Sequence, residues 1–496
     1  MNHRPAGHPP TVWKTGTAPG IFPPLTHGIA LFRRPLEFLD SLSAHGDLVE
    51  IRLGPTRAWV VCHPRLVHEM LRDARTFDKG GPLYTRLRGL MGDGVVTCPH
   101  ADHRRQRRLL QPAFRPARVA RLTGPMGEEA EDLCRAWRDG QEVDVSAAMM
   151  TVTTGVVSRV LFSDALDPAR AAEVRDCLST VVRGLFVRTV VPVDAFFRLP
   201  LPGHRRYTRA VARLRAVVDE VVAQRRRTGG ARDDVLGTLL AAADGPEPEV
   251  TGGEVQDQLV SLLLTGAESA ALCLSSAFGF LALHPEAEQR MHAEVDTVLA
   301  GRARPTAEDL PRLVYTRSVV DESLRLAPPG WLFTRLTTRE VEFGGRRLPA
   351  GTTVLYSPYL LHHAPESFPD PERFLPERWR RGGPDGPFSP MVPFAAGSRK
   401  CLGDTFALAQ ATVTLATVAR HWRLRHRPGP VPPLRPAVTL GPRALVMRCE
   451  RRPEQPGPVP AGTAAGAATA VPRARACPPP AVRVPREAGD AGGHDA

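Results

Sequence analysis

Lysine is scarce in this chain, and arginine carries almost all of its positive charge. Lys14, Lys79 and Lys400 are the lysines, whereas lysine and arginine together number 65 against 52 aspartates and glutamates. A formal net charge of +13 suggests acidic partners, such as nucleic acid, anionic lipid or an acidic protein. An even spread of arginine over a solvated surface explains most of this charge, so charge alone does not indicate a nucleic-acid binder.

The cysteines are scattered, and no two of them form a Cys-x-x-Cys pair. This absence argues against a zinc or iron–sulfur site, and a chain of 496 residues with ample apolar content is too long for a disulfide scaffold. The stretch from Met1 to Pro24 is polar and proline-rich, without the apolar run of a signal peptide. We therefore expect a cytoplasmic protein. The cysteines are Cys62, Cys98, Cys134, Cys177, Cys273, Cys401, Cys449 and Cys477.

One long apolar run begins at the sequence Thr-Gly-Gly-Glu, residues 251–254, where threonine as N-cap and glutamate three positions later predict the start of a helix. The run continues to His284 and stops at Pro285. It would span about 50 Å, which is long enough to cross a bilayer. Asp257, Glu268 and several serines argue against lipid, and no basic flank anchors either end. We predict a central helix buried on all sides, and no transmembrane segment.

The middle of that helix carries an ionisable side chain beside a hydroxyl. Glu268 and Ser269 follow Thr265, Gly266 and Ala267. A carboxyl buried in a helix is costly unless it is paired or takes part in chemistry. Gly266 has no side chain, so a large group can lie close to the helix backbone there.

A loop that leads into another helix, from Asp404 onward, holds a single cysteine between glycines. Gly397 and Gly403 flank Cys401, and glycine lets the backbone approach a bulky group where a Cβ would clash. Arg399 and Lys400 precede the sulfur, so we expect the local field to favour the thiolate. One thiolate in such a loop suits the proximal ligand of a heme, where it favours O–O bond cleavage. The alternative is a structural cysteine in a surface loop.

The order Phe394-x-x-Gly397-x-Arg399-x-Cys401-x-Gly403 resembles the heme-ligand signature of the cytochrome P-450 superfamily. The resemblance implies a mainly α fold with a small β region, in which a single domain encloses heme b and Cys401 is the axial ligand of the iron. This domain would span residues 20–452, after an N-terminal coil over residues 1–19. Residues 453–496 are rich in proline, alanine, glycine and arginine, and we expect a disordered tail because this composition cannot bury enough surface to fold.

Glu268 and Ser269 resemble the family's acid–alcohol pair, which passes protons to iron-bound oxygen. The family's usual sequence motif has alanine at the position of Thr265 in this chain, and threonine at the position of Ser269. Serine keeps the hydroxyl, so a proton relay remains possible, but it lacks the methyl group that fixes the rotamer. The resemblance implies a monooxygenase that uses O2 as co-substrate.

Other residues take roles from the same resemblance. His103 and Arg107 lie one helical turn apart and, with Arg335, fall where the family holds the two heme propionates. The alternative for the basic stretch around Arg107 is a solvated helix face. A further triad in the family locks the segment before the cysteine loop, which is a structural role. Its members here would be Glu322, Arg325 and Arg378.

No flavin or ferredoxin domain is evident in the sequence, which implies that electrons from NAD(P)H arrive through separate proteins. The family's redox partners are small acidic ferredoxins with their reductases. A basic face with Lys400, Arg399 and one or both of Arg104 and Arg105 would steer such a partner. We expect a monomer with no nucleic-acid partner.

The residues expected to line the substrate pocket are apolar and predict a lipophilic molecule. They are Leu262, Leu263, Ala267, Leu332 and Phe333. The sequence of residues 77–82, 98–100 and 328–331 resembles that of bacterial terpene oxygenases of the pentalenene oxygenase type. This resemblance implies oxidation of a sesquiterpene in secondary metabolism. A macrolide or fatty-acid hydroxylase is the alternative within this fold. A heme-binding sensor without turnover is the alternative outside the enzymes.

Shorter elements surround these motifs. Alternation over residues 47–53 and 58–62 predicts a β-hairpin, and residues 64–73 are typical of a helix with proline at its start. Residues 80–98 are rich in glycine and predict an irregular binding loop. The proline-rich break over residues 192–206 resembles the family's mobile lid, and short strands over residues 431–448 would turn at Gly441-Pro442.

Overall fold

The computed structural model describes residues 12–20, 26–163, 166–190, 197, 199, 201–229, 232–380, 383, 384 and 386–453. Most of the predicted N-terminal coil, most of the predicted tail and the core of the proline-rich break lie outside these residues. All structural statements below concern the described part of the chain.

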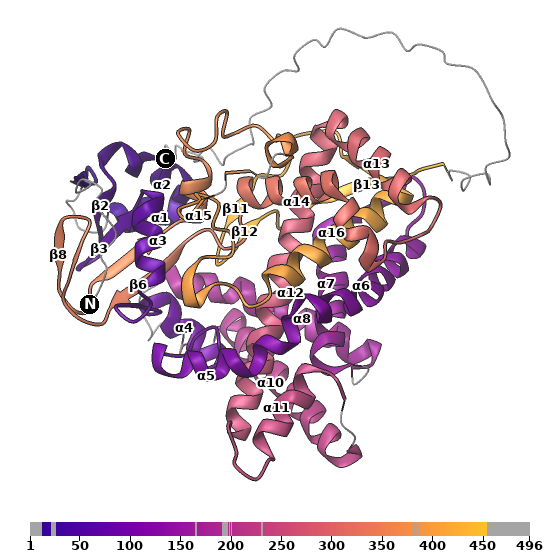
Figure 1. Ribbon diagram of the computed structural model, residues 1–496, viewed down its shortest axis with the longest axis horizontal. Helices are drawn as coiled ribbons and strands as arrows, with labels where there is room; N and C mark the ends of the chain where they lie inside the picture. Colours follow the sequence, from indigo (N-terminus) through magenta and orange to yellow (C-terminus); the bar gives the residue numbers. More distant parts are fainter. Residues whose placement is uncertain are drawn as a thin grey trace, which may run out of the picture.

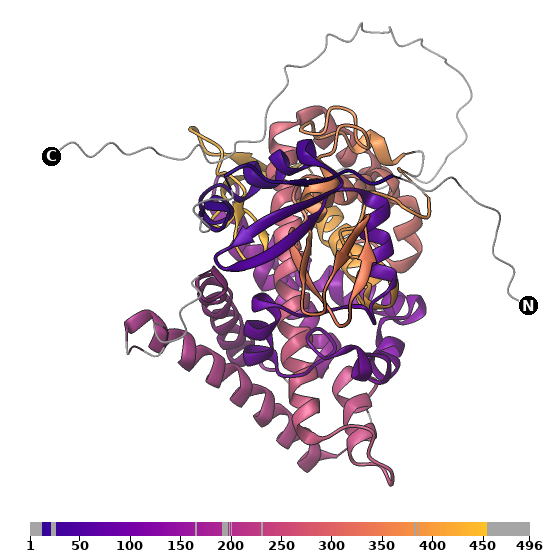
Figure 2. The ribbon, with the colours of Figure 1, turned by 90° about the vertical axis from the view of Figure 1, so that its left-hand side faces the viewer.

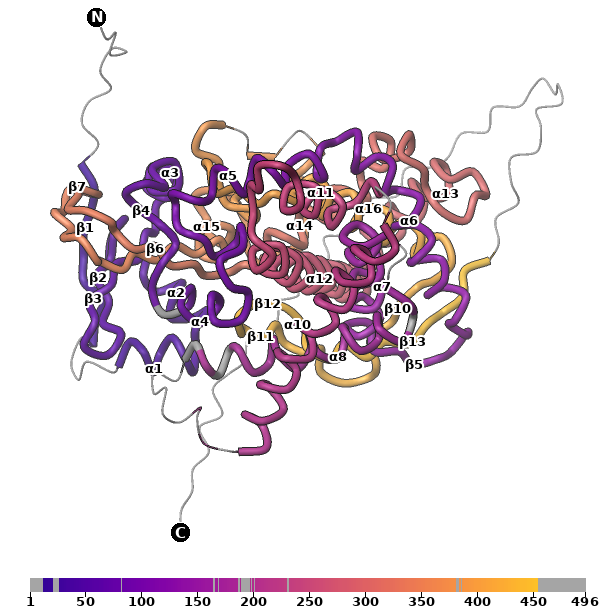
Figure 3. The backbone as a smooth tube through the Cα atoms, turned by 90° about the horizontal axis from the view of Figure 1, so that it is seen from below, coloured from indigo at the N-terminus to yellow at the C-terminus, as the bar shows by residue number. Residues whose placement is uncertain are grey.

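Helix α12 (Gly252–Leu283) runs through the middle of the molecule, as Figures 1 and 3 show. The predicted capping box forms, because the Thr251 hydroxyl accepts from the Glu254 amide at 3.1 Å and the Glu254 carboxylate accepts from the Thr251 amide at 2.8 Å. The helix ends at His284, where Pro285 starts the next helix. The prediction of a long central helix is therefore confirmed.

Other helices pack around α12. Figure 3 shows α7, α14 and α16 close beside it in the view from below, and these three also contact it. Two described helices, α7 and α12, are long and apolar enough to cross a membrane, yet most of each apolar window is buried in the protein, as in core helices of a folded domain. The helices of this body are α6 (Pro116–Ala136), α7 (Val145–Phe162), α8 (Pro168–Val190), α10 (Pro202–Thr228), α11 (Val235–Ala243), α13 (Pro285–Leu299), α14 (Val314–Leu326) and α16 (Asp404–His421).

The largest described sheet lies at one end of the helical body, and Figure 2 views the molecule from that end. Its order is β1-β2-β3-β9-β6-β4. Strands β2 and β3 form the predicted hairpin, with Leu53 paired to Thr56 across the turn at Gly54-Pro55. The strands are β1 (Thr15–Thr17), β2 (Leu48–Leu53), β3 (Thr56–Val61), β4 (Phe77–Asp78), β6 (Phe333–Thr337) and β9 (Thr353–Tyr356).

The glycine-rich segment over residues 80–98 is not wholly irregular, because it contains helix α4 (Pro82–Met91). Pro82 starts this helix. Leu83, Leu87, Leu90 and Met91 then recur at three- or four-residue spacing and pack into or against the main core cluster. The prediction of a loop was wrong because Gly80 and Gly81 lie before the helix, and the helical spacing of apolar residues begins directly after them.

The C-terminal strands form two small units. Strand β10 (Trp422–His426) pairs with β13 (Val446–Arg451), which in turn pairs with β5 (Glu142–Asp144). Strands β11 (Arg435–Pro436) and β12 (Leu440–Gly441) form a hairpin. It turns over residues 437–439 and not at Gly441-Pro442, where β12 ends. The remaining elements are α1 (Thr26–Arg33), α2 (Pro35–Leu42), α3 (Pro64–Arg72), α5 (His100–Leu110), α15 (Pro358–His362), β7 (Val341–Phe343), β8 (Arg346–Leu348) and five 3-10 turns: η1 (Ser43–His45), η2 (Gln111–Phe114), η3 (Ala307–Arg312), η4 (Pro376–Trp379) and η5 (Gly397–Arg399).

Candidate cofactor and active site

The cysteine loop is a tight turn closed by its own backbone. The Cys401 amide donates to the Phe394 carbonyl at 2.9 Å. Gly397 adopts a φ of +69°, and a Cβ built there would lie 2.9 Å from the carbonyl carbon of Leu71 in α3. Only glycine fits this conformation and this close approach. Gly403 then serves as the N-cap of α16, so the loop is fixed at both ends.

The Cys401 side chain is accessible to solvent although protein atoms surround it on most sides. Both properties hold if the thiol opens onto a space inside the molecule. Burial raises the pKa of the Cys401 thiol, whereas the hydrogen bond from the Gly403 amide and the charges of Lys79 and Arg107 lower it. Burial outweighs these opposing effects.

The expected effect of Arg399 and Lys400 on this thiol is wrong for the chain without a cofactor. Arg399 pairs with Asp78 at 2.8 Å, and Lys400 pairs with Asp404 at 2.6 Å. Each charge is therefore balanced by a neighbouring carboxylate. The Arg399 side chain is also 1% exposed, so it cannot belong to a docking face for a redox partner.

A stripe of accessible residues interrupts the otherwise buried middle of α12. Between Gln258 and Phe278, the partly exposed residues are Leu262, Thr265, Gly266 and Ser269. Their spacing of three, one and three residues places them on one face of the helix. Because other elements surround this part of α12, the stripe lines a space inside the protein.

Two of the predicted pocket residues do not lie on this stripe. Leu263 and Ala267 are completely buried. The Ala267 carbonyl accepts from the Thr153 hydroxyl of α7 at 2.9 Å, so this side of α12 faces α7. The prediction that Leu263 and Ala267 line the pocket is therefore wrong. Leu332 and Phe333 are half-buried, and the Phe333 ring stacks on Tyr356 with centroids 5.2 Å apart.

Glu268 and Ser269 have different partners. The Ser269 hydroxyl donates to the Thr265 carbonyl one turn earlier, at 2.8 Å. The Glu268 carboxyl is buried and accepts a hydrogen bond of 2.7 Å from the Thr439 hydroxyl, with Arg443 at 3.5 Å. Burial raises the pKa of Glu268, and Thr439 and Arg443 only partly oppose this effect. The carboxyl therefore binds a proton more readily than an ordinary glutamate does.

A cluster of cations lies near the cysteine loop. Lys79 is half-buried, and its ammonium donates to the Val96 carbonyl at 2.7 Å. Burial, reinforced by the charges of Arg335 and Arg399, lowers the pKa of Lys79 from 10.5 to about 7. Arg335 is 2% exposed and meets the hydroxyl groups of Tyr84 and Tyr356 at 3.3 and 3.5 Å.

The two predicted residues of α5 complete this cluster. Burial, with the charges of Arg399, Lys79 and Arg107, lowers the pKa of His103 to about 3. Arg107 donates to the carbonyl of Lys400 at 2.5 Å. Within the described residues, no carboxylate forms an ion pair with Lys79, His103, Arg107 or Arg335.

His103 is neutral near pH 7 because its pKa is about 3, whereas Arg335 is a buried cation without an anion among the described residues, which is costly. A bound group that carries carboxylates and accepts a thiolate ligand would relieve this cost. Heme has both properties, so the cation cluster, the accessible thiol of Cys401 and the stripe on α12 fit it.

The family model for cytochrome P-450 matches residues 26–447. The chain belongs to the cytochrome P-450 family. The prediction of a mainly α fold with a small β region is thereby confirmed, and so is the assignment to the heme-dependent monooxygenases.

Three Streptomyces proteins are similar to this P-450 over most of their length. A cyclooctat-9-en-7-ol 5-monooxygenase of Streptomyces melanosporofaciens is 48% identical, over 85% of this chain and 92% of its own. A cyclooctatin synthase of the same organism is 44% identical, over 88% and 95%. A pentalenene oxygenase of Streptomyces avermitilis is 40% identical, over 88% and 97%. The predicted resemblance to oxygenases of the pentalenene oxygenase type is confirmed.

The three residues grouped as a structural triad are in contact in this P-450. Glu322 and Arg325 of α14 are completely buried and form two hydrogen bonds, at 2.8 and 3.0 Å. Arg378 of η4 donates to the same carboxylate at 3.3 Å. The indole of Trp379 adds a fourth donor at 2.9 Å. The carboxylate of Glu322 therefore ties α14 to the segment before the cysteine loop.

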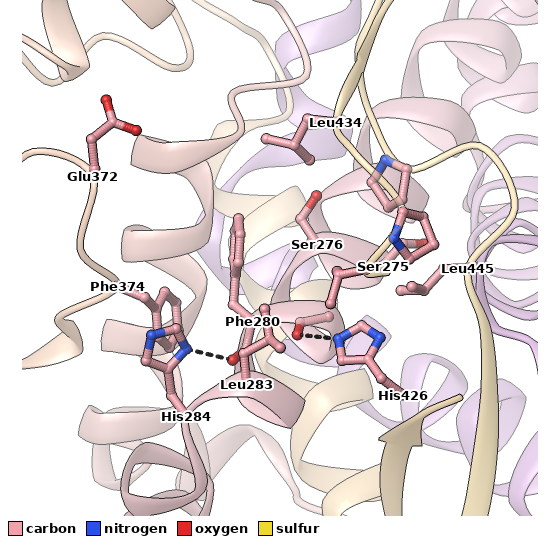
Figure 4. Close-up of a pocket in the computed structure, with 14 residues that line it drawn as sticks. Ser275, Ser276, Phe280, Leu283, His284, Glu372, Phe374, His426, Leu434 and Leu445 are labelled. Atoms are coloured by element: carbon pink, nitrogen blue, oxygen red, sulfur yellow. Dashed lines mark hydrogen bonds between the residues drawn. The ribbon is translucent and has the colours of Figure 1, made fainter. Parts of the chain in front are cut away.

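A small hollow elsewhere on α12 is not part of this site. Figure 4 shows it beside the C-terminal turns of the helix, where the His284 ring donates to the Phe280 carbonyl and the His426 ring donates to the Gly279 carbonyl. The two ring nitrogens lie 2.8 and 2.9 Å from the carbonyl oxygens of Phe280 and Gly279. Its volume of about 40 Å³ is enough for a few water molecules only.

Four residues of the site were missed from the sequence: Asp78, Lys79, Thr439 and Arg443. Lys79 carried a usable signal, because lysine is rare in this chain and here it follows directly on a strand. Asp78 had none, since its partner Arg399 lies 321 residues away. Thr439 is 171 residues from Glu268, and no local pattern relates the two.

Proposed function

We propose that this P-450 oxidises a terpene hydrocarbon or terpene alcohol in secondary metabolism, with a heme b held by Cys401. The observation that carries the proposal is the thiol of Cys401, which is accessible although protein atoms surround it on most sides, at the end of a turn that only Gly397 permits. A structural cysteine in a surface loop needs no such access.

The cation cluster would hold the carboxylates of the heme. His103, Arg107 and Arg335 take this role in the family resemblance, and Lys79 supplies a further, half-buried ammonium close to Arg335 and His103. Each carboxylate would pair with cations that otherwise lack an anion. When bound, a heme with a thiolate ligand supplies oxygen activation.

Glu268 and Ser269 would handle protons at this site. The Ser269 hydroxyl lies on the accessible stripe of α12, so it can donate to or accept from a group in the cavity. Glu268 lies about 100° away around the helix, and burial raises its pKa, so it binds a proton more readily than an ordinary glutamate does. These two residues argue against a sensor that only binds heme.

The substrate class rests on the relatives and on the wall of the cavity. The relatives' names state oxygenation of an unsaturated alcohol and of pentalenene, and similarity of 40–48% over most of each chain supports the same class here. Leu262, Leu332 and Phe333 are partly exposed and offer apolar surface for such a molecule. A macrolide or fatty-acid hydroxylase is the second candidate, because the same apolar wall accepts other lipophilic groups.

Electrons would come from NAD(P)H through a ferredoxin and its reductase. Lys400 is half-exposed and Arg104 is exposed, so both can meet an acidic partner. Arg105 is less available, since it binds Glu254 and the Glu249 carbonyl. We propose that the enzyme acts as a cytoplasmic monomer.

The test is a binding screen followed by product analysis. Purified ferric enzyme is titrated with sesquiterpenes, including pentalenene, with larger cyclic terpenes and their alcohols, and with a macrolide and a fatty acid. A terpene should shift the heme toward high spin and, with a surrogate ferredoxin and reductase, give an oxygenated product. If only the macrolide or the fatty acid shifts the spectrum and is hydroxylated, the terpene assignment is wrong.

A further inference from the structure

The Glu268 carboxyl has both of its partners on one C-terminal segment, the β11–β12 hairpin and the residues just after it. The Thr439 hydroxyl donates to Oε1 of Glu268 at 2.7 Å, and Nη1 of Arg443 lies 3.5 Å from the same oxygen. Arg443 also donates to the Thr439 carbonyl at 3.0 Å. The two partners therefore brace one another as well as the carboxyl.

The hairpin is fixed relative to α12 and to the wall of the cavity. The Leu440 amide donates to the Pro329 carbonyl at 3.0 Å, and the Trp331 indole donates to the Ala437 carbonyl at 2.9 Å. A Cβ built at Gly441 would lie 2.9 Å from the side chain of Leu272, one turn after Glu268 on α12. The backbone on both sides of Thr439 is thus held in place.

This segment also connects the buried carboxyl with solvent. The Arg443 side chain is 27% exposed, whereas that of Glu268 is 9% exposed. Among the described residues, Arg443 is the charged group that lowers the pKa of Glu268, and Thr439 donates a hydrogen bond to the Glu268 carboxylate. Both favour the ionised carboxyl against the effect of burial.

We infer that Thr439 and Arg443 are positioning residues that hold the Glu268 carboxyl on the hairpin side of α12, where it takes up protons from solvent for delivery toward Ser269. The inference rests on the proposed role of Glu268 and Ser269. It adds the direction from which protons enter and the residues that control this entry.

The proton transfer balances in two steps. The Glu268 carboxylate takes one proton from a solvent water beside Arg443, and the resulting hydroxide is neutralised by bulk solvent. After rotation of its side chain, Glu268 gives that proton to the Ser269 hydroxyl while the hydroxyl releases its own proton into the cavity. Glu268 returns as a carboxylate to Thr439 and Arg443.

The first test measures the protonation of Glu268 directly in the heme-loaded enzyme. The carboxyl stretch of Glu268 is isolated by infrared difference spectroscopy against Glu268→Gln and is followed as a function of pH. Arg443→Met and Thr439→Val should each move the titration of Glu268 to higher pH, because each removes a group that favours the carboxylate. Arg443→Lys and Thr439→Ser should restore most of the original titration.

Arg427→Met is the matched control. Arg427 lies in the same C-terminal region, but it is exposed, pairs with Glu142 at 3.0 Å and is not among the groups that act on Glu268. Its removal should leave the titration of Glu268 unchanged. An equal shift in Arg427→Met and Arg443→Met would overturn the inference, because the effect would then be one of net charge.

The second test asks whether protons are delivered. With a surrogate ferredoxin and reductase and a terpene that binds, oxygenated product per NAD(P)H should fall about tenfold in Arg443→Met, with peroxide rising and a larger solvent isotope effect. An unchanged product yield would overturn the inference even if the titration of Glu268 moves.

Failure of this inference is distinguishable from failure of the proposed function. If wild-type enzyme shows the thiolate-ligated spectrum with carbon monoxide and oxidises a terpene, the proposed function holds whatever Arg443→Met does. If wild-type enzyme lacks that spectrum, the proposed function fails, and the infrared titration still reports whether Thr439 and Arg443 control Glu268.

Discussion

Replacement of Glu322 by glutamine should sharply reduce the stability of this enzyme. Glu322 and Arg325 are completely buried, and the carboxylate receives two hydrogen bonds from the guanidinium. Glutamine keeps the shape of the side chain but removes its charge. Arg325 would then have no anion, and its acceptors would be neutral, among them the carbonyls of His362, Pro371 and Arg373 at 3.0, 2.7 and 3.0 Å.

The magnitude follows from the burial of the pair. Breaking a buried ion pair by removing one partner costs about 3–5 kcal/mol, because the other charge stays buried without an anion. The Leu375 amide and the Trp379 indole also lose a charged acceptor. A protein is stable by about 5–15 kcal/mol in total, so Glu322→Gln should remove roughly a fifth or more of that free energy of unfolding.

The assay is urea unfolding of the heme-loaded enzyme, followed by circular dichroism and by heme absorbance. Glu340→Gln is the matched control, since Glu340 forms an exposed pair with Arg347 at 3.0 Å and should cost less than about 1 kcal/mol. The double variant of Glu322→Gln and Arg325→Met should lose less than the sum of the two single variants. A loss below about 1 kcal/mol for Glu322→Gln would refute the reasoning, because it would mean that the buried pair contributes no more than a surface pair.

Three further predictions concern the site. Lys79→Met should weaken heme binding, measured by heme transfer to an acceptor protein. The cofactor-free chain should become no less stable, because the substitution removes an ammonium that has no anion beside it among the described residues. A less stable cofactor-free protein with unchanged heme retention would contradict this. The pKa of Lys79 is about 7 in the folded chain against 10.5 ordinarily, so the unfolded chain binds the additional proton between these values. The contribution of Lys79 to the stability of the cofactor-free protein should therefore rise from pH 7 to 10.5, by up to about 1.4 kcal/mol per pH unit, and the difference in unfolding free energy between Lys79→Met and wild type should change with pH by this amount. Gly397→Ala should destabilise the holoenzyme by about 1–3 kcal/mol or more and lower its heme content, because φ is +69° and the Leu71 carbonyl is close. Ala395→Gly, at a φ of +57°, should be tolerated. Equal losses of stability in the two variants would contradict this explanation.

Local patterns in the sequence were enough for the elements that depend on near neighbours. The capping box at Thr251 and the stop at Pro285 define α12 without reference to the rest of the chain. The cysteine loop is equally local, since the hydrogen bond that closes it joins Phe394 and Cys401, only seven positions apart. The helix α4 was missed because Gly80 and Gly81 precede it and suggest a loop.

Local sequence patterns could not predict the ion pairs between distant residues or the side of a helix that faces the cavity. Arg399 is neutralised by Asp78, which is distant in sequence, so its influence on Cys401 depends on tertiary structure. Lys400 pairs with Asp404 four residues later, and that pair was within reach of a helical-spacing argument. Leu263 and Leu262 are adjacent, and only the packing of α7 decides which of them faces the cavity.

The most direct test of the account is the absorption spectrum of the dithionite-reduced enzyme with and without carbon monoxide, for wild type, Cys401→Ala and Cys98→Ala. Cys98 is a matched control because its sulfur lies 3.7 Å from Arg399 in the same region. Wild type and Cys98→Ala should show the strongly red-shifted Soret band for which the family is named, and Cys401→Ala should lose it. A red-shifted band that survives in Cys401→Ala, or a histidine-type band in freshly prepared, folded wild type, would contradict the assignment of Cys401 as the iron ligand.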